Sequence, residues 1–183
     1  IILTEGIHIL QHLILIVLTC SLCQFRNQRC LLYPVRDRPL SAYKKSNAFK
    51  LYLNDVGLLG RKFDLDVQTV LAGDNLFTEF KGVMAENYVL QSLVRQFGNS
   101  QYYWTSGNMA EVEFVLQADG KIIPIEVKAD KNVTAKSLAY YRKQYTPQLS
   151  VRLSTLNMRK DDDLLNLPLY LVDKMSRFVS VAD

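Results

Sequence analysis

The sequence has no glycine-rich loop of the GxxxxGK[ST] type, whose backbone N–H groups hold nucleotide phosphates in many ATPases. The nearest string, GLLGRK at residues 57–62, has the wrong spacing between its glycines and its basic residues. We therefore expect no nucleotide to bind this chain in the P-loop manner.

Cysteine and histidine are also scarce, with three and two residues in the whole chain. Cys20, Cys23 and Cys30 are odd in number, and no second cysteine pair or nearby histidine completes a tetrahedral metal site around the CxxC at 20–23. Reduced thiols of a cytoplasmic protein are the interpretation that this pattern favours.

No basic residue precedes the apolar stretch from Ile7 to Cys23, so it lacks the positive region of a signal peptide. At roughly 17 residues, the stretch has the shortest length that spans a bilayer. We expect a buried helix here. A transmembrane anchor is the alternative, although a membrane is not the partner that we expect.

The remaining composition is that of an ordinary globular chain with a net charge of +4, which permits contact with nucleic acid without requiring it. Three regions differ in pattern. Residues 1–30 are apolar, residues 31–73 contain a proline-punctuated stretch, and residues 74–183 are regular. In the second region Phe49, Leu51 and Leu53 alternate with polar residues, which predicts a half-buried strand, and Asp55–Gly57 predicts a turn.

The third region predicts a mixed α/β fold with an antiparallel hairpin at its centre. A helix is expected from about Glu79, capped by Thr78, to Phe97 before Gly98. Glu86 falls within its apolar stripe, which includes Val83. The other expected elements are strands at 101–104, 110–117, 121–129 and 149–153, a helix at 134–145, a solvated turn at 161–163 and a last strand in LLNLPLYLVDKM.

The hairpin is the most informative segment, AEVEFVLQADGKIIPIEVKA at residues 110–129. Asp119-Gly120 between two alternating runs predicts a two-residue type I′ turn, which fixes the register of the strands. Counting from the turn, Glu113 faces Glu126, with Lys128 on the same side. The opposite side is expected to be apolar; its residues are Val112, Phe114, Leu116, Ile123, Ile125 and Val127.

Two ionised carboxylates in facing positions repel each other, so something should offset the charge. A divalent cation would do so, because Mg²⁺ prefers carboxylate oxygens. The alternative is a solvated face on which the carboxylates point apart.

These residues resemble a known pattern. A helix glutamate, an acidic residue on one strand and IEVKA on its partner are similar to the PD-(D/E)xK nuclease superfamily. More narrowly, NAFKLYLNDVGLL, GDNLFTEFKGVMAENYVLQSL and IIPIEVKA look like the C-terminal domain of unknown function 4143, which follows the core of AAA+ ATPases in bacteria and archaea.

The resemblance implies a restriction-endonuclease-like fold, with a mixed central sheet flanked by helices, in residues 74–183. It implies a remnant of a winged-helix segment in residues 31–73, and an AAA+ ATPase core upstream in complete relatives. It also implies catalytic roles for Glu86, Glu113, Glu126 and Lys128, with Mg²⁺ or Mn²⁺ held by Glu113 and Glu126. Relatives usually have aspartate where this chain has Glu113, and the extra methylene bears on metal geometry.

Two functions follow as expectations. The first is a metal-dependent, nuclease-like domain that binds DNA and cleaves phosphodiester bonds. The second is a degenerate nuclease fold that binds a protein partner or regulates the ATPase. Four basic residues after the hairpin are candidates for nucleic-acid contact, or else the solvated face of an amphipathic helix: Lys131, Lys136, Arg142 and Lys143.

Overall fold

The computed structural model describes residues 25–30, 39–65, 68, 75–98, 101–106, 110–129 and 134–180. The apolar stretch at 7–23 and Lys131 lie outside these ranges. None of the helices within them is both long and apolar enough to cross a membrane.

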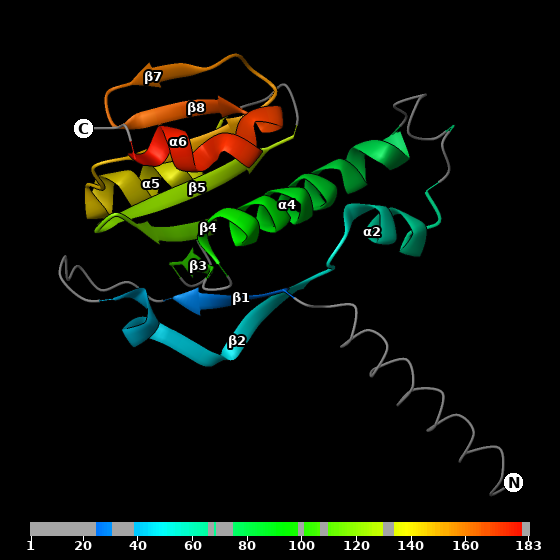
Figure 1. Ribbon diagram of the computed structural model, residues 1–183, viewed down its shortest axis with the longest axis horizontal. Helices are drawn as coiled ribbons and strands as arrows, with labels where there is room; N and C mark the ends of the chain where they lie inside the picture. The colour runs from blue at the N-terminus through cyan, green and yellow to red at the C-terminus, as the bar shows by residue number, and fades with distance from the viewer. Residues whose placement is uncertain are drawn as a thin grey trace, which may run out of the picture.

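The described strands form one mixed sheet of eight strands in the order β2-β1-β3-β4-β5-β6-β8-β7 (Figure 1). Three pairs are parallel, namely β1 with β3, β5 with β6, and β6 with β8; the others are antiparallel. The strands are β1 (Phe25–Cys30), β2 (Lys44–Tyr52), β3 (Tyr102–Thr105), β4 (Glu111–Ala118), β5 (Lys121–Lys128), β6 (Ser150–Ser154), β7 (Arg159–Asp161) and β8 (Leu164–Pro168).

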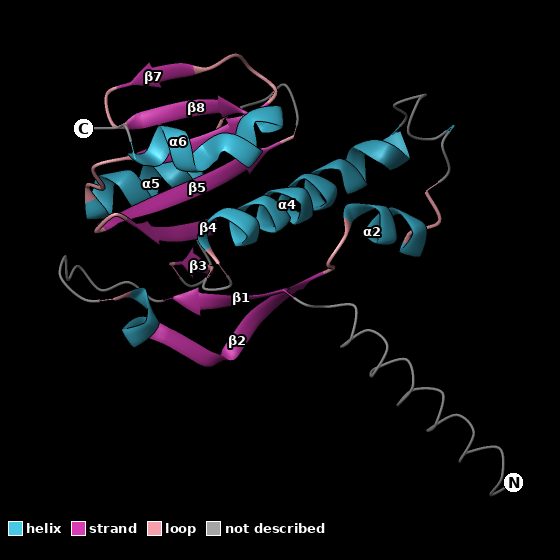
Figure 2. Ribbon diagram, in the orientation of Figure 1, coloured by secondary structure: helices cyan, strands magenta, loops and turns pink. Residues whose placement is uncertain are grey.

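Helices cover both faces of this sheet (Figure 2). The long α4 and the short α6 share one face, and α5 lies on the other. The helical elements are η1 (Leu40–Tyr43), α2 (Val56–Lys62), α4 (Asn75–Phe97), α5 (Lys136–Tyr145), η2 (Leu169–Lys174) and α6 (Met175–Ser180). The expected mixed α/β sheet flanked by helices is therefore confirmed. The boundary between regions that the sequence predicted after residue 30 falls between β1 and β2. These two strands pair with each other in the same sheet.

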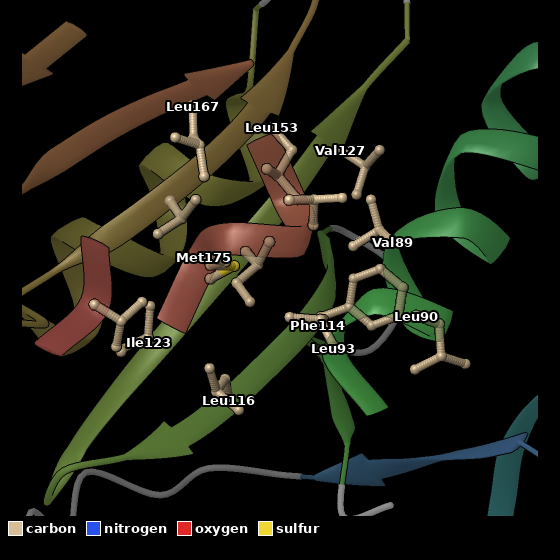
Figure 3. Packing of buried hydrophobic residues seen from close by; sticks show 14 of the residues in the cluster. Val89, Leu90, Leu93, Phe114, Leu116, Ile123, Val127, Leu153, Leu167 and Met175 are labelled. Carbon is tan, nitrogen blue, oxygen red and sulfur yellow. The ribbon is translucent and has the colours of Figure 1, made fainter. Parts of the chain in front are cut away.

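The larger core lies between the sheet and α4, where Val89, Leu90 and Leu93 pack toward Phe114 and Val127 (Figure 3). Burying side chains of this size contributes about 1.5–3 kcal/mol each. The helix begins at Asn75 rather than at Glu79. The expected apolar stripe is confirmed at Leu90 and Leu93 but not at Val83, which is 46% exposed, and Val89 is fully buried beside it.

The predicted phase of β2 was wrong. Phe49 and Leu51 are exposed, and Tyr52 is buried with its ring centroid 6.0 Å from that of Phe114. Packing against β4, which the local alternation could not reveal, selects the opposite face of the strand. The expected turn at Asp55 is instead a helix N-cap, since the Asp55 carboxylate accepts a hydrogen bond from the Leu58 N–H at 3.1 Å and α2 begins at Val56.

A β-bulge in β4 corrects the expected apolar face of the hairpin. Tyr102 faces Val115 and Trp104 faces Val112, so three steps along β4 match two along β3. Val112 consequently packs with Trp104 and Tyr141 on the α5 side of the sheet. The other five residues of that expected face belong to the core on the α4 side.

The hairpin register itself is confirmed, because Ala118 pairs with Lys121 and each further pair follows the predicted count as far as Phe114 with Ile125. Asp119 and Gly120 both have positive φ, at 49° and 73°, as a type I′ turn requires.

We expect Gly120→Ala to lower the free energy of unfolding by about 1–2 kcal/mol, because a Cβ is strained at that positive φ. The matched control is Gly82→Ala in α4, where the added Cβ has no neighbour within 4 Å. This change should raise the free energy by about 0.5–1 kcal/mol through helix propensity. Urea unfolding of both variants measures the two signs, and equal effects at the two positions would contradict the turn assignment.

Candidate functional site

Three of the four predicted site residues meet at the open end of the hairpin. Lys128 Nζ lies 2.7 Å from Glu126 Oε1 and 4.0 Å from Glu113 Oε1. The side chains of Glu113 and Glu126 are 14% and 3% exposed, and that of Lys128 is 26% exposed. The expected solvated face with carboxylates turned apart is therefore wrong at this position.

The divergence of two strands makes room for this group. β5 pairs with β6 up to Lys128, whereas its pairing with β4 is regular from the turn to Ile125. In a continued ladder the Val127 N–H would donate to the backbone of β4. It donates instead to Glu113 Oε2 at 3.4 Å, so this side chain occupies the place of a backbone acceptor.

Burial raises the pKa of Glu113 to about 9, and the charge of Glu126 and a hydrogen bond with it act in the same direction. Glu126 Oε2 is buried and has no hydrogen-bond partner among the described residues. Burial opposes the charge on Lys128, but its hydrogen bond to Glu126 and the nearby carboxylates outweigh this and leave its pKa raised. The carboxylate pair thus has more negative charge than Lys128 offsets, and a proton or a cation is needed there.

Glu86 adjoins this group from α4 without joining its ion pairs. Its half-buried carboxylate accepts a hydrogen bond from the Tyr52 hydroxyl at 3.4 Å. Burial raises its pKa, while Lys50, Tyr52 and Lys128 each lower it. Glu86 is therefore near enough to the group for the charge of Lys128 to lower its pKa, while its role in the site stays a prediction.

Strand β2 supplies neighbours that the sequence reading missed. Lys50 forms an ion pair with Glu111 and lies 5.3 Å from the centre of the Tyr103 ring. Asn87, next to Glu86, holds the end of the strand, because its amide accepts from the Leu53 N–H at 2.9 Å and donates to the Leu53 carbonyl at 3.1 Å. Lys50 and Tyr52 both lie on the side of β2 that the sequence pattern predicts to face solvent.

The carboxylate oxygens at this position meet part of what a hard divalent cation requires of its ligands. Carboxylates are the ligands that Mg²⁺ and Mn²⁺ accept, and Glu126 Oε2 is a buried oxygen without a partner. Glu113 and Glu126 are thus the residues that would hold such an ion. Within the described ranges, however, no three acidic, histidine or cysteine side chains come close enough to form a metal site.

The candidate nucleic-acid residues are not equivalent. Lys136 and Lys143 are exposed on α5, while Arg142 forms an ion pair with Asp163, with Arg142 Nε 2.9 Å from Asp163 Oδ2. The other face of α5 packs Leu138 and Tyr141 into the protein. The helix is therefore amphipathic, and Arg142, which was expected on its solvated face, instead joins it to Asp163. Contact of Lys136 and Lys143 with nucleic acid stays a prediction.

We expect the pH dependence of stability to change in Glu113→Gln. The pKa of this carboxyl is near its ordinary value of 4.5 in the unfolded chain and near 9 in the folded one. Between these values the folded state binds more protons, so the free energy of unfolding falls as pH rises and the loss is complete above about 9. Relative to the native chain, the variant should gain stability across that window.

Urea unfolding at a series of pH values measures this difference. Glu111→Gln is the control, because it removes a partly exposed ion pair with Lys50 and should shift the stability curve without changing its slope across this window. A constant offset between Glu113→Gln and the native chain at every pH would refute the buried, protonated carboxyl.

Comparison with known proteins gives one match. A search found no similar protein among those with curated descriptions and no similar solved structure. Residues 81–171, from the first third of α4 into η2, match the family described as Domain of unknown function (DUF4143).

Proposed function

We propose that this chain contains a nuclease-like site that binds the phosphodiester backbone of DNA and, with Mg²⁺ or Mn²⁺, hydrolyses it. The observation that carries the proposal is the buried pair of Glu113 and Glu126 beside Lys128. Its support beyond geometry is the resemblance of these residues to the PD-(D/E)xK superfamily. By the same resemblance the domain would act in the cytoplasm as the C-terminal part of an AAA+ ATPase.

Each side chain has a role that its surroundings permit. Glu113 and Glu126 would hold the cation, which when bound lowers the pKa of water and offsets charge on the phosphate. Lys128 is a point cation already held at the carboxylates, and it would orient the attacking water or stabilise the charge that develops on the phosphate. Glu86, fixed by Tyr52, borders the site and would accept a proton from water.

A second candidate is a nuclease fold without catalysis that serves as a protein-interaction or regulatory module. Three observations favour it. Glu113 stands where the resemblance leads one to expect aspartate, and its raised pKa means that a cation must displace a proton. Among the described residues no third carboxylate completes a metal site.

Cleavage of DNA separates the two functions. We expect Mg²⁺- or Mn²⁺-dependent cleavage by the purified chain, and a loss on the order of 10²–10³ in rate in Lys128→Ala and in Glu126→Gln, because each removes charge at the reacting phosphate. Lys160→Ala is the control for the lysine change, since Lys160 is exposed on the far edge strand β7. This variant should cleave DNA as the native chain does.

Calorimetric titration with Mg²⁺ and Mn²⁺ completes the test. Metal binding that is lost in Glu126→Gln supports the metal site even if cleavage is slow. A folded chain that neither binds either metal nor cuts single- or double-stranded DNA would overturn the catalytic proposal and favour the interaction module.

A further inference from the structure

Arg152 lies beside the acidic pair on the next strand of the sheet. β5 and β6 are parallel, and their register pairs Glu126 with Arg152 and Lys128 with Ser154. Paired residues of neighbouring parallel strands project from the same face of a sheet. The residues between them confirm the faces, because Val127 and Leu153 pack together in the core on the α4 side.

The orientation of Arg152 is set by a hydrogen-bonded chain on β8. Its Nε donates to Asn166 Oδ1 at 2.9 Å, and Ser154 Oγ donates to the same oxygen at 2.8 Å. Asn166 is 3% exposed, and its Nδ2 donates to the Asn157 carbonyl at 2.9 Å. A side chain held in this way loses little freedom when it binds a ligand.

The chemistry of the position suits a phosphate. Guanidinium presents a planar fork of donors that matches two phosphate oxygens, and the half-buried Arg152 is reachable from solvent. Two cations, Lys128 and Arg152, then flank Glu126 on one face of the sheet. A ligand that binds both cations must be anionic. Because it then also lies beside the acidic pair, it must bind together with a cation.

We propose that Arg152 binds a phosphate of the nucleic-acid backbone next to the one at the acidic pair, with Asn166 as its positioning residue. This inference rests on the proposed function, since it assigns the same kind of ligand. It concerns binding rather than hydrolysis, and so it can be tested when no cleavage occurs.

The test is fluorescence anisotropy of a labelled single-stranded oligodeoxynucleotide with Ca²⁺ in place of Mg²⁺, over a series of salt concentrations. Arg152→Gln should weaken binding about tenfold to a hundredfold, since it removes charge-assisted hydrogen bonds. The slope of log K against log salt should become shallower by about 0.7, the value for one lost phosphate contact on a single strand. Arg152→Lys should keep the native slope while losing part of the affinity.

Arg159→Gln is the matched control. Arg159 faces Asn166 in the register of β7 and β8, so it lies in the same row of the sheet as Arg152 but two strands away. Its Nε forms an ion pair with Asp161 Oδ1 at 2.8 Å. The affinity of the Arg159→Gln variant for the oligodeoxynucleotide, and the slope of log K against log salt, should equal those of the native chain. Thermal unfolding of each variant shows whether it is folded. If Arg152→Gln is not folded, the affinity of Arg152→Lys decides, and native affinity in that variant would overturn the inference.

A native slope and affinity in folded Arg152→Gln would overturn the inference. Equal losses in Arg159→Gln would also overturn it, because they would indicate nonspecific attraction to positive charge. Binding that depends on Arg152 without any cleavage would uphold it and reject only the hydrolytic function. Absence of binding by the native chain would reject both.

Discussion

The separation of β4 from β5 beyond Ile125 is the constraint on which the site depends. Up to that point the two strands share a ladder that the Asp119-Gly120 turn sets in register. Beyond it, β5 continues along β6 only, and the gap is filled by a carboxylate that accepts a hydrogen bond from the Val127 N–H. Two acids and one lysine are thus confined to a space with little water, where their charges act strongly on one another.

Much of this arrangement could be predicted from local sequence because it is governed by local rules. A two-residue turn allows one register, so the pairs from the turn to Phe114 with Ile125 followed from counting. The predicted pair of Glu113 with Glu126 lies beyond the last regular pair, and these two side chains come together where the strands diverge. The expected helix contains Glu86, but its place near Lys128 depends on the packing of α4 with β2, which local patterns do not give. The mixed α/β order followed from the alternation of helical and extended patterns.

The remainder depended on contacts between distant segments. The bulge opposite Tyr103 changes which face Val112 occupies, and nothing in the sequence of β4 marks it. The packing of Tyr52 on Phe114 reverses the phase of β2, so that two apolar side chains there face outward. The position of Arg152 could not be predicted, because its strand is a parallel neighbour separated in sequence by a helix, and its register cannot be counted through a turn.

Asn87 ties the position of the strand before α4 to the helix itself. Its side-chain amide hydrogen-bonds to both backbone groups of Leu53, as a peptide group of a neighbouring strand would. Glu86 is the residue immediately before it in the helix. A slip of β2 by one residue would break both bonds and turn the Tyr52 hydroxyl away from Glu86, because successive side chains of a strand point to opposite faces. The helix acid is therefore positioned by a segment that lies upstream of the family match, and the same segment contacts the hairpin directly through Lys50 and Tyr52.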